Sequence, residues 1–365
     1  MVNKPSLQIL PLLGRHLWRR YCALDAKKSM HVAESVSRQP TLTLNNRKKK
    51  VALLVGYNGQ GYNSFQIKPG NRSIEDQLLM ALQKGGFASE EECQNSESVF
   101  LHCGAKTGKD ISAVKQTVSL LLSTDNNVEE RLNSHLPPEI RVLGIRPLAA
   151  EIDSALIRDP DFCTYGYILP TFALSPFGLE SKSFRASPQL IDRFREILGL
   201  FEGTKNLHNF LLRSKFENPD SERSIKKFEC LEPFELGNQQ YVECQVTSKI
   251  FKKDQIRLMV AFAFAIVKGI VKQNLVEKAF TQTKLDVLKA PEGGLFLQEV
   301  IFFFKESSTK QHSCSFQLHY HSYNEKFCKD GALEKLCWEQ EEETIQSFKN
   351  DHIIPNIVNR VKDIS

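Results

Sequence analysis

Strand-like apolar runs alternate with helical patterns in two successive stretches of the chain, and this alternation constrains the fold more than any other feature. The first stretch opens with an apolar run at 51–56 that ends at Asn58-Gly59, followed by a helix that Ser73 caps and Gly85-Gly86 ends. The periodicity predicts further strands at 100–103, 117–122, 140–145, 164–169, 240–246 and 296–304, and helices at 129–134, 189–200 and 254–272. Two such units predict an α+β fold with two domains, 51–150 and 151–305, that share one extended, mainly antiparallel sheet.

The composition excludes several classes of protein. With 365 residues, 41% hydrophobic and 25% charged, the chain is long enough for two packed domains of ordinary globular composition. It has no run of about eighteen apolar residues, so we expect no membrane span. Its nine cysteines are scattered without a Cys-x-x-Cys pair. This pattern favours reduced thiols in an intracellular protein, and no His/Cys/Asp set has the spacing of metal ligands.

The positive charge is concentrated outside the predicted domains. Of the formal net charge of +5, residues 1–24 carry +4, residues 25–50 carry +5 and residues 306–365 carry −3, which leaves −1 for residues 51–305. Because non-specific affinity for a nucleic acid grows with the number of phosphates neutralised, any cleft for such a ligand must be a local basic lining on a nearly neutral body.

One loop carries the strongest functional signal. Residues 105–113, here called the signature loop, read Ala-Lys-Thr-Gly-Lys-Asp-Ile-Ser-Ala. They follow the short predicted strand at 100–103 and precede the strand at 117–122.

The signature loop resembles that of the TruA-type tRNA pseudouridine synthases, especially their eukaryotic branch, which typically read Ala-Arg-Thr-Asp-Lys-Gly-Val-Ser-Ala. Gly108 stands where the family carries its catalytic aspartate, and Asp110 stands where the family carries glycine. Further blocks match in family order at 53–62, 73–75, 133–137, 165–171, 208–210, 255–260 and 290–295, so that the resemblance spans residues 50 to 305. It implies a pseudouridine-synthase fold that binds RNA, above all tRNA, in a cleft between the two domains, and it implies no organic cofactor and no metal.

The replacement at Gly108 bears directly on catalysis. The family's aspartate attacks covalently as a carboxylate nucleophile on a nucleotide that has left its stack, and glycine offers no atom for this role. Asp110 is the candidate substitute, but two extended residues displace its backbone by roughly 6 to 7 Å, which exceeds the reach of its side chain. The competing interpretation is that Asp110 is a turn residue in the left-handed backbone that glycine normally supplies, and we weight this interpretation above a relocated nucleophile.

Other site positions carry over only in part. Lys106 replaces an arginine of the family and loses its planar, two-pronged donor; with Lys109 it is a candidate RNA-binding residue. Tyr165 matches the tyrosine that stacks on the target base, although it also suits an ordinary sheet aromatic. Arg257 matches the arginine that pairs with the catalytic carboxylate, and without a carboxylate at position 108 we expect it to be partly buried and unpaired unless Asp110, water or an RNA phosphate approaches it.

The residues ahead of Arg257 depart from the family pattern. Phe251-Lys252-Lys253-Asp254 stands where the family usually places apolar residues and histidine. Asp254 suits a helix N-cap, and the two lysines suit either phosphate contacts or solvent. His208-Asn209-Phe210 and the phenylalanines at 302–304 are predicted to pack in the sheet and core.

Three functions remain open from the sequence. The first is a TruA-like RNA-binding protein whose isomerase activity is lost or greatly reduced. The second is an active tRNA pseudouridine synthase that uses a rearranged loop with Asp110 as nucleophile. The third is a non-RNA interaction protein built on the inherited fold, which the nearly neutral body favours.

The two ends of the chain fall outside the resemblance. Residues 1–24 have no acid and interleave leucines with arginines, which is typical of a mitochondrial presequence. Residues 25–50 read as a basic linker, and Arg47-Lys48-Lys49-Lys50 leaves a nuclear signal open as the alternative. Residues 306–365 read as an accessory acidic tail, with a solvated acidic helix around 339–343.

Overall fold

The computed structural model describes residues 48–94, 96–123, 127–148, 157–176, 181–272, 274–306, 316–317 and 333–362. The predicted presequence and residues 25–47 of the predicted linker lie outside the described residues. The last three residues of that linker, 48–50, are not linker but the start of strand β1 (Lys48–Tyr57), because their backbone pairs with residues 121–123. Lys48 also forms an ion pair with Glu92, at 2.6 Å.

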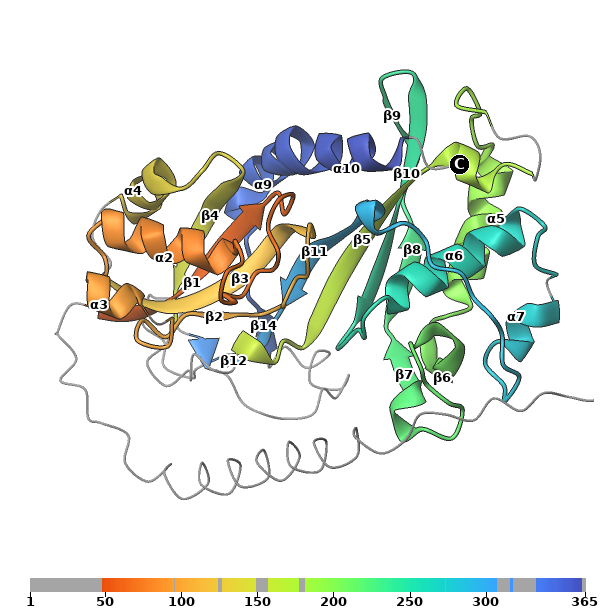
Figure 1. The fold of residues 1–365 in the computed structure, drawn as a ribbon, viewed down its shortest axis with the longest axis horizontal. Helices are drawn as coiled ribbons and strands as arrows, with labels where there is room; N and C mark the ends of the chain where they lie inside the picture. Colours follow the sequence, from red (N-terminus) through yellow and green to blue (C-terminus); the bar gives the residue numbers. More distant parts are fainter. Residues whose placement is uncertain are drawn as a thin grey trace, which may run out of the picture. The chain divides into compact units, whose positions relative to one another are not determined.

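A nine-stranded sheet forms the frame of the described chain (Figure 1). Its main path runs β4-β1-β3-β11-β5-β10-β8, with β2 added to β3 and β9 added to β10. Besides β1, the strands are β2 (His102–Cys103), β3 (Ser112–Ser123), β4 (Ile140–Pro147), β5 (Phe162–Pro170), β8 (Lys227–Cys230), β9 (Phe234–Leu236), β10 (Gln239–Ser248) and β11 (Leu295–Ile301). The pairing of β3 with β11 is parallel, and the other pairings in this sheet are antiparallel.

The β3–β11 pairing joins the two stretches of chain that the sequence separates. On one side, the predicted helix at Ser73 is α2 (Ile74–Lys84), whose N-cap Ser73 accepts a hydrogen bond from the Asp76 amide as expected. Its buried face packs with β1, β3, β4 and α4 (Val128–His135) in one hydrophobic cluster. The short helix α3 (Glu90–Cys93) follows α2.

On the other side, a second hydrophobic cluster lies between β5, β10 and β8 and the helices α5 (Pro188–Gly199) and α6 (Gln255–Val267). Five phenylalanines pack by edge-to-face and tilted contacts at its centre: Phe201, Phe210, Phe228, Phe262 and Phe280. A two-stranded sheet of β6 (Gly203–Asn206) and β7 (Glu222–Ile225) and the short helix α7 (Asn274–Lys278) complete this part. The core therefore has one cluster in each sequence stretch, on a single continuous sheet.

The strand predicted at 296–304 is interrupted at Phe302, which is 1% exposed. The chain leaves the large sheet there and continues as β12 (Phe303–Glu306), which pairs with β13 (Phe316–Gln317) and β14 (Leu333–Lys335).

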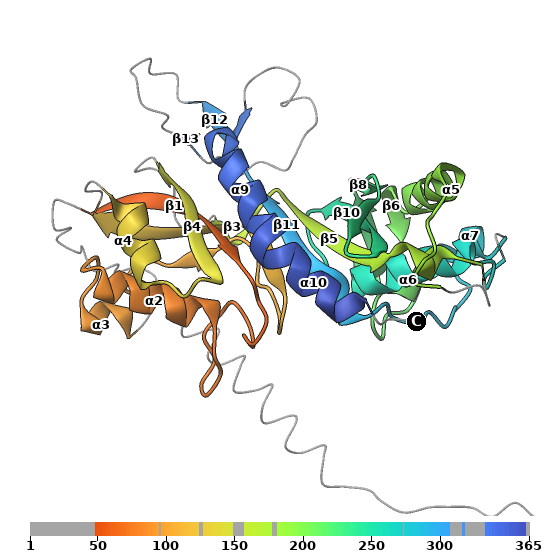
Figure 2. The same ribbon diagram turned by 90° about the horizontal axis from the view of Figure 1, so that it is seen from above.

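The last described segment is not the accessory tail that the sequence predicts. Helix α9 (Glu342–Phe348), the π-helical turn η7 (Lys349–Ile353) and α10 (Ile354–Val361) form one line of helix that crosses the strands near β11 and β5 (Figure 2). Ile345, Ile353, Ile357 and Val361 are each fully buried in the first hydrophobic cluster. Acidic residues at 339–343 face outward in part, but Ile353, Ile357 and Val361 recur every four residues and bury one face of the helix.

Candidate active site

Buried side chains from two strands fix the first half of the signature loop. On β3, the Gln116 amide donates to the Ala105 carbonyl (2.6 Å) and its oxygen accepts from the Ala105 amide (3.1 Å). On β1, the Tyr57 hydroxyl lies 2.8 Å from the Thr107 hydroxyl. All four residues are buried. Buried hydrogen bonds to β1 and β3 therefore hold the backbone that leads to position 108.

Gly108 sits in an exposed, open place. A Cβ built at this position would meet no heavy atom within 4 Å, and its φ does not fall in the left-handed region. Neither space nor backbone conformation therefore demands glycine here. A larger side chain such as that of aspartate would therefore fit at position 108.

Asp110 serves as the turn residue of the loop. Its φ is 57°, in the left-handed region that aspartate tolerates better than most residues. Its carboxylate accepts a hydrogen bond from the Gly61 amide (2.9 Å), its amide donates to the Tyr62 carbonyl (3.0 Å), and its carbonyl accepts from Arg360 of α10 (2.9 Å). Each of these contacts fixes the turn.

A cavity of about 590 Å³ opens beside Gly108. It is lined by Asn63, Ser64, Gln66, Lys68, Lys106, Thr107, Gly108, Lys109, Ile111, Tyr165, Phe251, Lys252, Lys253, Asp254, Gln255, Ile256, Arg257, Glu292 and Leu295. The cavity thus brings together Gly108, Lys106, Lys109, Tyr165 and Arg257, five of the six residues that the sequence singles out. Asp110 does not line it.

Tyr165 lies in the cavity wall on β5, between β10 and β11. Its ring meets Phe251 edge to face, with the centroids 5.5 Å apart and the planes at 82°. Burial raises the pKa of its hydroxyl, so the ring stays a neutral phenol. A half-buried aromatic in a cavity of this size can stack on a planar base.

Arg257 is paired, contrary to the expectation from the sequence. Its Nη1 lies 2.7 Å from Oδ1 of Asp254 and its Nε donates to the Ala290 carbonyl at 2.7 Å. Asp254 is therefore the ion-pair partner of this guanidinium. Glu292 lies farther away, with an oxygen 3.9 Å from the same Nη1.

Asp254 occupies the N-cap position of α6 but does not cap the helix. It has φ 62°, and its side chain accepts no capping hydrogen bond from the backbone amides of the first turn. Its carboxylate instead holds two cations, Arg257 through Oδ1 and Lys289 through Oδ2 at 2.8 Å, and its side chain is only 6% exposed. Burial alone would raise the pKa of this carboxyl, but Lys289 and Arg257 outweigh burial and lower it.

The basic lining expected from the charge distribution is present at the cavity. Five lysines line it: Lys68, Lys106, Lys109, Lys252 and Lys253. All five are exposed, and Lys252 lies 3.4 Å from Asp220. A phosphate backbone that enters the cavity would meet this charge.

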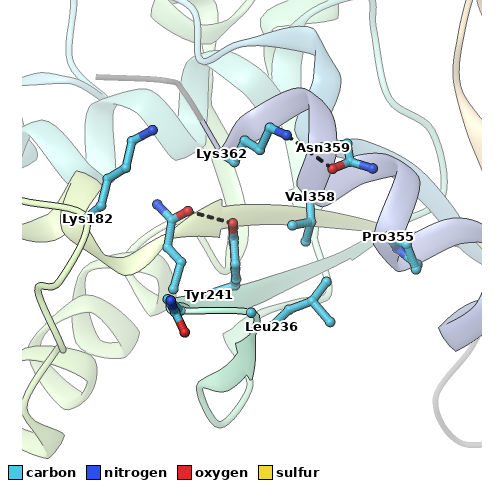
Figure 3. Close-up of a pocket in the computed structure, with 10 residues that line it drawn as sticks. Lys182, Leu236, Tyr241, Pro355, Val358, Asn359 and Lys362 are labelled. Atoms are coloured by element: carbon cyan, nitrogen blue, oxygen red, sulfur yellow. Dashed lines mark hydrogen bonds between the residues drawn. The ribbon is translucent and has the colours of Figure 1, made fainter.

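A second cavity, of about 360 Å³, lies between α10 and the β9–β10 hairpin, away from the signature loop (Figure 3). It is lined by Leu236, Pro355 and Val358 together with polar side chains. Two hydrogen bonds in its wall, Tyr241 to Gln239 and Lys362 to Asn359, stay within β10 and α10 respectively.

Other sequence predictions concern packing and metals. His208, Asn209 and Phe210 are buried, and the Asn209 amide donates to two backbone carbonyls, so the predicted structural role is confirmed. Within the described ranges, no group of three or more His, Cys, Asp or Glu side chains is placed to hold a metal ion. Over the same residues, no helix is both long and apolar enough to cross a membrane.

Sequence reasoning missed two supports of the site. Lys289 directly precedes the matched block at 290–295, and nothing in that block signals its contact with Asp254. Arg360 lies in the segment that the sequence sets aside as a tail. The sequence also did not predict the Asp254–Arg257 pair, because Asp254 precedes α6 and has a positive φ.

Known proteins with similar sequences are named as members of the family that the signature loop resembles. Over 321 residues the chain is 33% identical to the mouse (Mus musculus) "Pseudouridylate synthase 1 homolog", which covers 87% of this chain and 71% of that protein. The human protein of the same name is 33% identical over 318 residues, covering 86% and 70%. The "tRNA pseudouridine synthase 1" of Yarrowia lipolytica is 24% identical over 394 residues, covering 85% and 71%.

The other comparisons add little. No protein-family model matches the chain. A solved structure, titled "Crystal Structure of a Cbf5-Nop10-Gar1 Complex", overlaps 58% of this chain and 53% of its own with a TM-score of 0.24 and 11% identity, too low to support an argument. The identity and coverage of the mouse and human relatives, together with the ordered motifs around the cavity, show that the chain belongs to the TruA-type tRNA pseudouridine synthase family.

Proposed function

We propose that this protein binds tRNA in the cavity beside Gly108, on a two-domain pseudouridine-synthase fold, and that its uridine-to-pseudouridine isomerase activity is lost or strongly reduced. The observation that carries the proposal is the absence of a carboxylate at position 108, the place of the family's nucleophile. Gly108 supplies none, and the carboxylate of Asp110 is bonded to the Gly61 amide outside the cavity. Two other carboxylates line the cavity. Both oxygens of Asp254 are held by cations, and one oxygen of Glu292 lies 3.9 Å from Nη1 of Arg257.

The positions of these carboxylates decide whether one of them can act as the nucleophile. A carboxylate that attacks a sugar or base must have an oxygen free to form a bond. Loss of a nucleophile in a protease costs on the order of a millionfold in rate, so we expect turnover near the uncatalysed level. The alternative that uses Asp110 requires the turn to be rebuilt, since its side chain now points to the amide of Gly61.

RNA binding is supported by what the cavity retains. Lys106, Lys109 and Lys253 offer positive charge for phosphates, and Tyr165 offers a ring for stacking. The volume of about 590 Å³ accommodates a nucleotide. We therefore expect retention of RNA without conversion.

One preparation tests both halves of the proposal. The full chain is incubated with tRNA transcripts, pseudouridine is quantified by mass spectrometry after chemical labelling, and affinity is measured across a salt series. We expect binding that weakens with salt and no detectable product. Robust turnover abolished by Asp110→Ala would establish the active-enzyme alternative, and a failure to retain RNA would favour the non-RNA interaction protein.

The salt dependence of RNA affinity in lysine variants tests whether the RNA binds at the cavity. Lys253→Ala should lower the slope of log affinity against log salt by about 0.7 to 1, the effect of one phosphate contact. Lys227→Ala, on the edge strand β8 and outside the cavity, is the matched control and should leave the slope unchanged. An equal effect of both substitutions would place the RNA elsewhere.

We also propose that residues 1–24 direct the protein to mitochondria, with the basic residues 47–50 as a nuclear alternative. The acid-free, leucine- and arginine-rich composition supports this. A fluorescent fusion that lacks residues 1–24 should leave mitochondria, and unchanged localisation would contradict the targeting proposal.

A further inference from the structure

Three features of the cavity concern its carboxylates. Position 108 has none, although there is space for a side chain. Asp254 lines the same cavity and has a buried carboxylate. Arg257 lies one helical turn from Asp254 and binds it.

The backbone of Asp254 is arranged around this contact. Its φ of 62° lies in the left-handed region, which is strained for a non-glycine residue and persists only where surrounding contacts hold it. Here the Lys252 amide donates to the Gln255 side chain (3.0 Å) and the Asp254 carbonyl accepts from the Leu258 amide (3.0 Å). These bonds turn the chain so that the carboxylate points back to Arg257 and Lys289, instead of capping α6.

The pair is also well sheltered. The side chain of Arg257 is 15% exposed and that of Asp254 is 6% exposed. An arginine left at this depth without a carboxylate would carry a large desolvation cost. The protein avoids that cost by supplying the anion from its own helix terminus.

Resting on the function proposed above, we propose that Asp254 is the resident counter-ion of Arg257: it replaces the carboxylate missing at position 108 and keeps the guanidinium engaged, so that a carboxylate restored at 108 must compete for it. Asp254 is on this view a positioning residue. Its two oxygens bind cations rather than substrate.

The consequence is a specific dependence between positions 108 and 254. In the unaltered protein, Asp254→Asn leaves Arg257 with only the exposed carboxylate of Glu292, 3.9 Å away. In a Gly108→Asp background, the new carboxylate enters the same cavity and can pair with Arg257. Asparagine is the suitable replacement because it tolerates the left-handed backbone and keeps the shape of the side chain.

The test is a double-mutant cycle on the full chain, read by thermal unfolding without RNA. Asp254→Asn should lower Tm by several degrees, and the loss should fall to less than about half when Gly108→Asp is present. Asp192→Asn is the matched control, because Asp192 forms an i,i+3 pair with Arg195 at 2.9 Å but is 65% exposed. It should change Tm little in either background. Equal losses from Asp254→Asn in the two backgrounds would overturn the proposal.

Activity measurements on the same proteins separate this proposal from the proposed function. Gly108→Asp with Asp254→Asn should form at least about tenfold more pseudouridine than Gly108→Asp alone, since misplacement of a reacting group costs on the order of a hundredfold. No gain over the single variant would contradict the competition for Arg257. Turnover by the unaltered protein would refute the loss of activity, whereas the Tm cycle would still report on the counter-ion.

Discussion

A buried ion pair under the C-terminal helices gives the sharpest test of how this fold is held together. Lys349, in η7, places its Nζ 2.9 Å and 3.0 Å from the two carboxylate oxygens of Glu243 on β10, and 3.0 Å from Oε1 of Gln298 on β11. The side chains of the pair are 8% and 6% exposed. Lys349→Met keeps the length of the side chain and removes the charge.

The expected cost follows from the burial. Removing one partner of a buried pair leaves the other charge unpaired and costs about 3 to 5 kcal/mol. At about 2 to 3 °C per kcal/mol for a protein of this size, Tm should fall by roughly 6 to 15 °C. Adding Glu243→Gln removes the stranded charge, so the double variant should regain more than half of the loss.

Thermal and urea unfolding of the full chain measure these changes. Lys227→Met is the control: Lys227 lies 2.6 Å from Glu229, but the pair is 58% and 37% exposed and should contribute less than about 1 kcal/mol. A loss from Lys349→Met no larger than that of the control, with no rescue by Glu243→Gln, would refute the docking of the C-terminal helices on the sheet.

Three further predictions concern the site. Asp110→Ala should lower the free energy of unfolding by about 1 kcal/mol, while Asp110→Gly should cost less because glycine accepts the left-handed turn without strain; urea unfolding checks both. Gly59→Ala should cost at least about 2 kcal/mol and weaken RNA binding, since the new Cβ would lie 2.2 Å from the Ile111 carbonyl oxygen in the signature loop. Because the folded pKa of Asp254 lies below its unfolded value of about 3.9, its contribution to stability is present above that pH and is lost as pH falls through the folded pKa. The stability gap between wild type and Asp254→Asn should therefore be full near pH 6 and shrink below about pH 4, and a gap that grows in acid would contradict this sign.

The sequence predicted the elements whose patterns are local. The strand at 51–56 and the helix after Ser73 carry both periodicity and a boundary signal, and the structure has them within a few residues. The short strands at 203–206 and 222–225 were missed because Gly-Thr-Lys-Asn and Glu-Arg-Ser-Ile have no apolar alternation to detect. The docking of the helices after 341 was missed because the acidic run at 339–343 indicates a solvated helix. The signal for a buried face is the spacing of Ile353, Ile357 and Val361, which lie four residues apart.

The sequence predicted which residues line the cavity, but not which of their side chains form ion pairs. From the matched motifs, the resemblance predicted that Gly108, Tyr165 and Arg257 belong to one site, and all three line the same cavity. It did not reveal that Asp254 binds Arg257, because that contact depends on a positive φ at position 254. No composition or periodicity rule predicts such a backbone conformation for aspartate; it follows from the tertiary contacts of the pair.

The turn at Asp110 also bears on whether a rearranged loop could restore catalysis. Three groups of this residue are bonded where it stands, its carboxylate to Gly61, its amide to Tyr62 and its carbonyl to Arg360. Breaking them costs about 1 kcal/mol each, and more for the charged contacts, so a loop that turns Asp110 toward the cavity lies at least about 3 kcal/mol above the observed one. Such a loop is populated at under about 1%, which lowers any rate through it by the same factor. Arg360 belongs to α10, so this C-terminal helix contributes to the free-energy cost of turning Asp110 toward the cavity. That cost disfavours Asp110 as a substitute nucleophile.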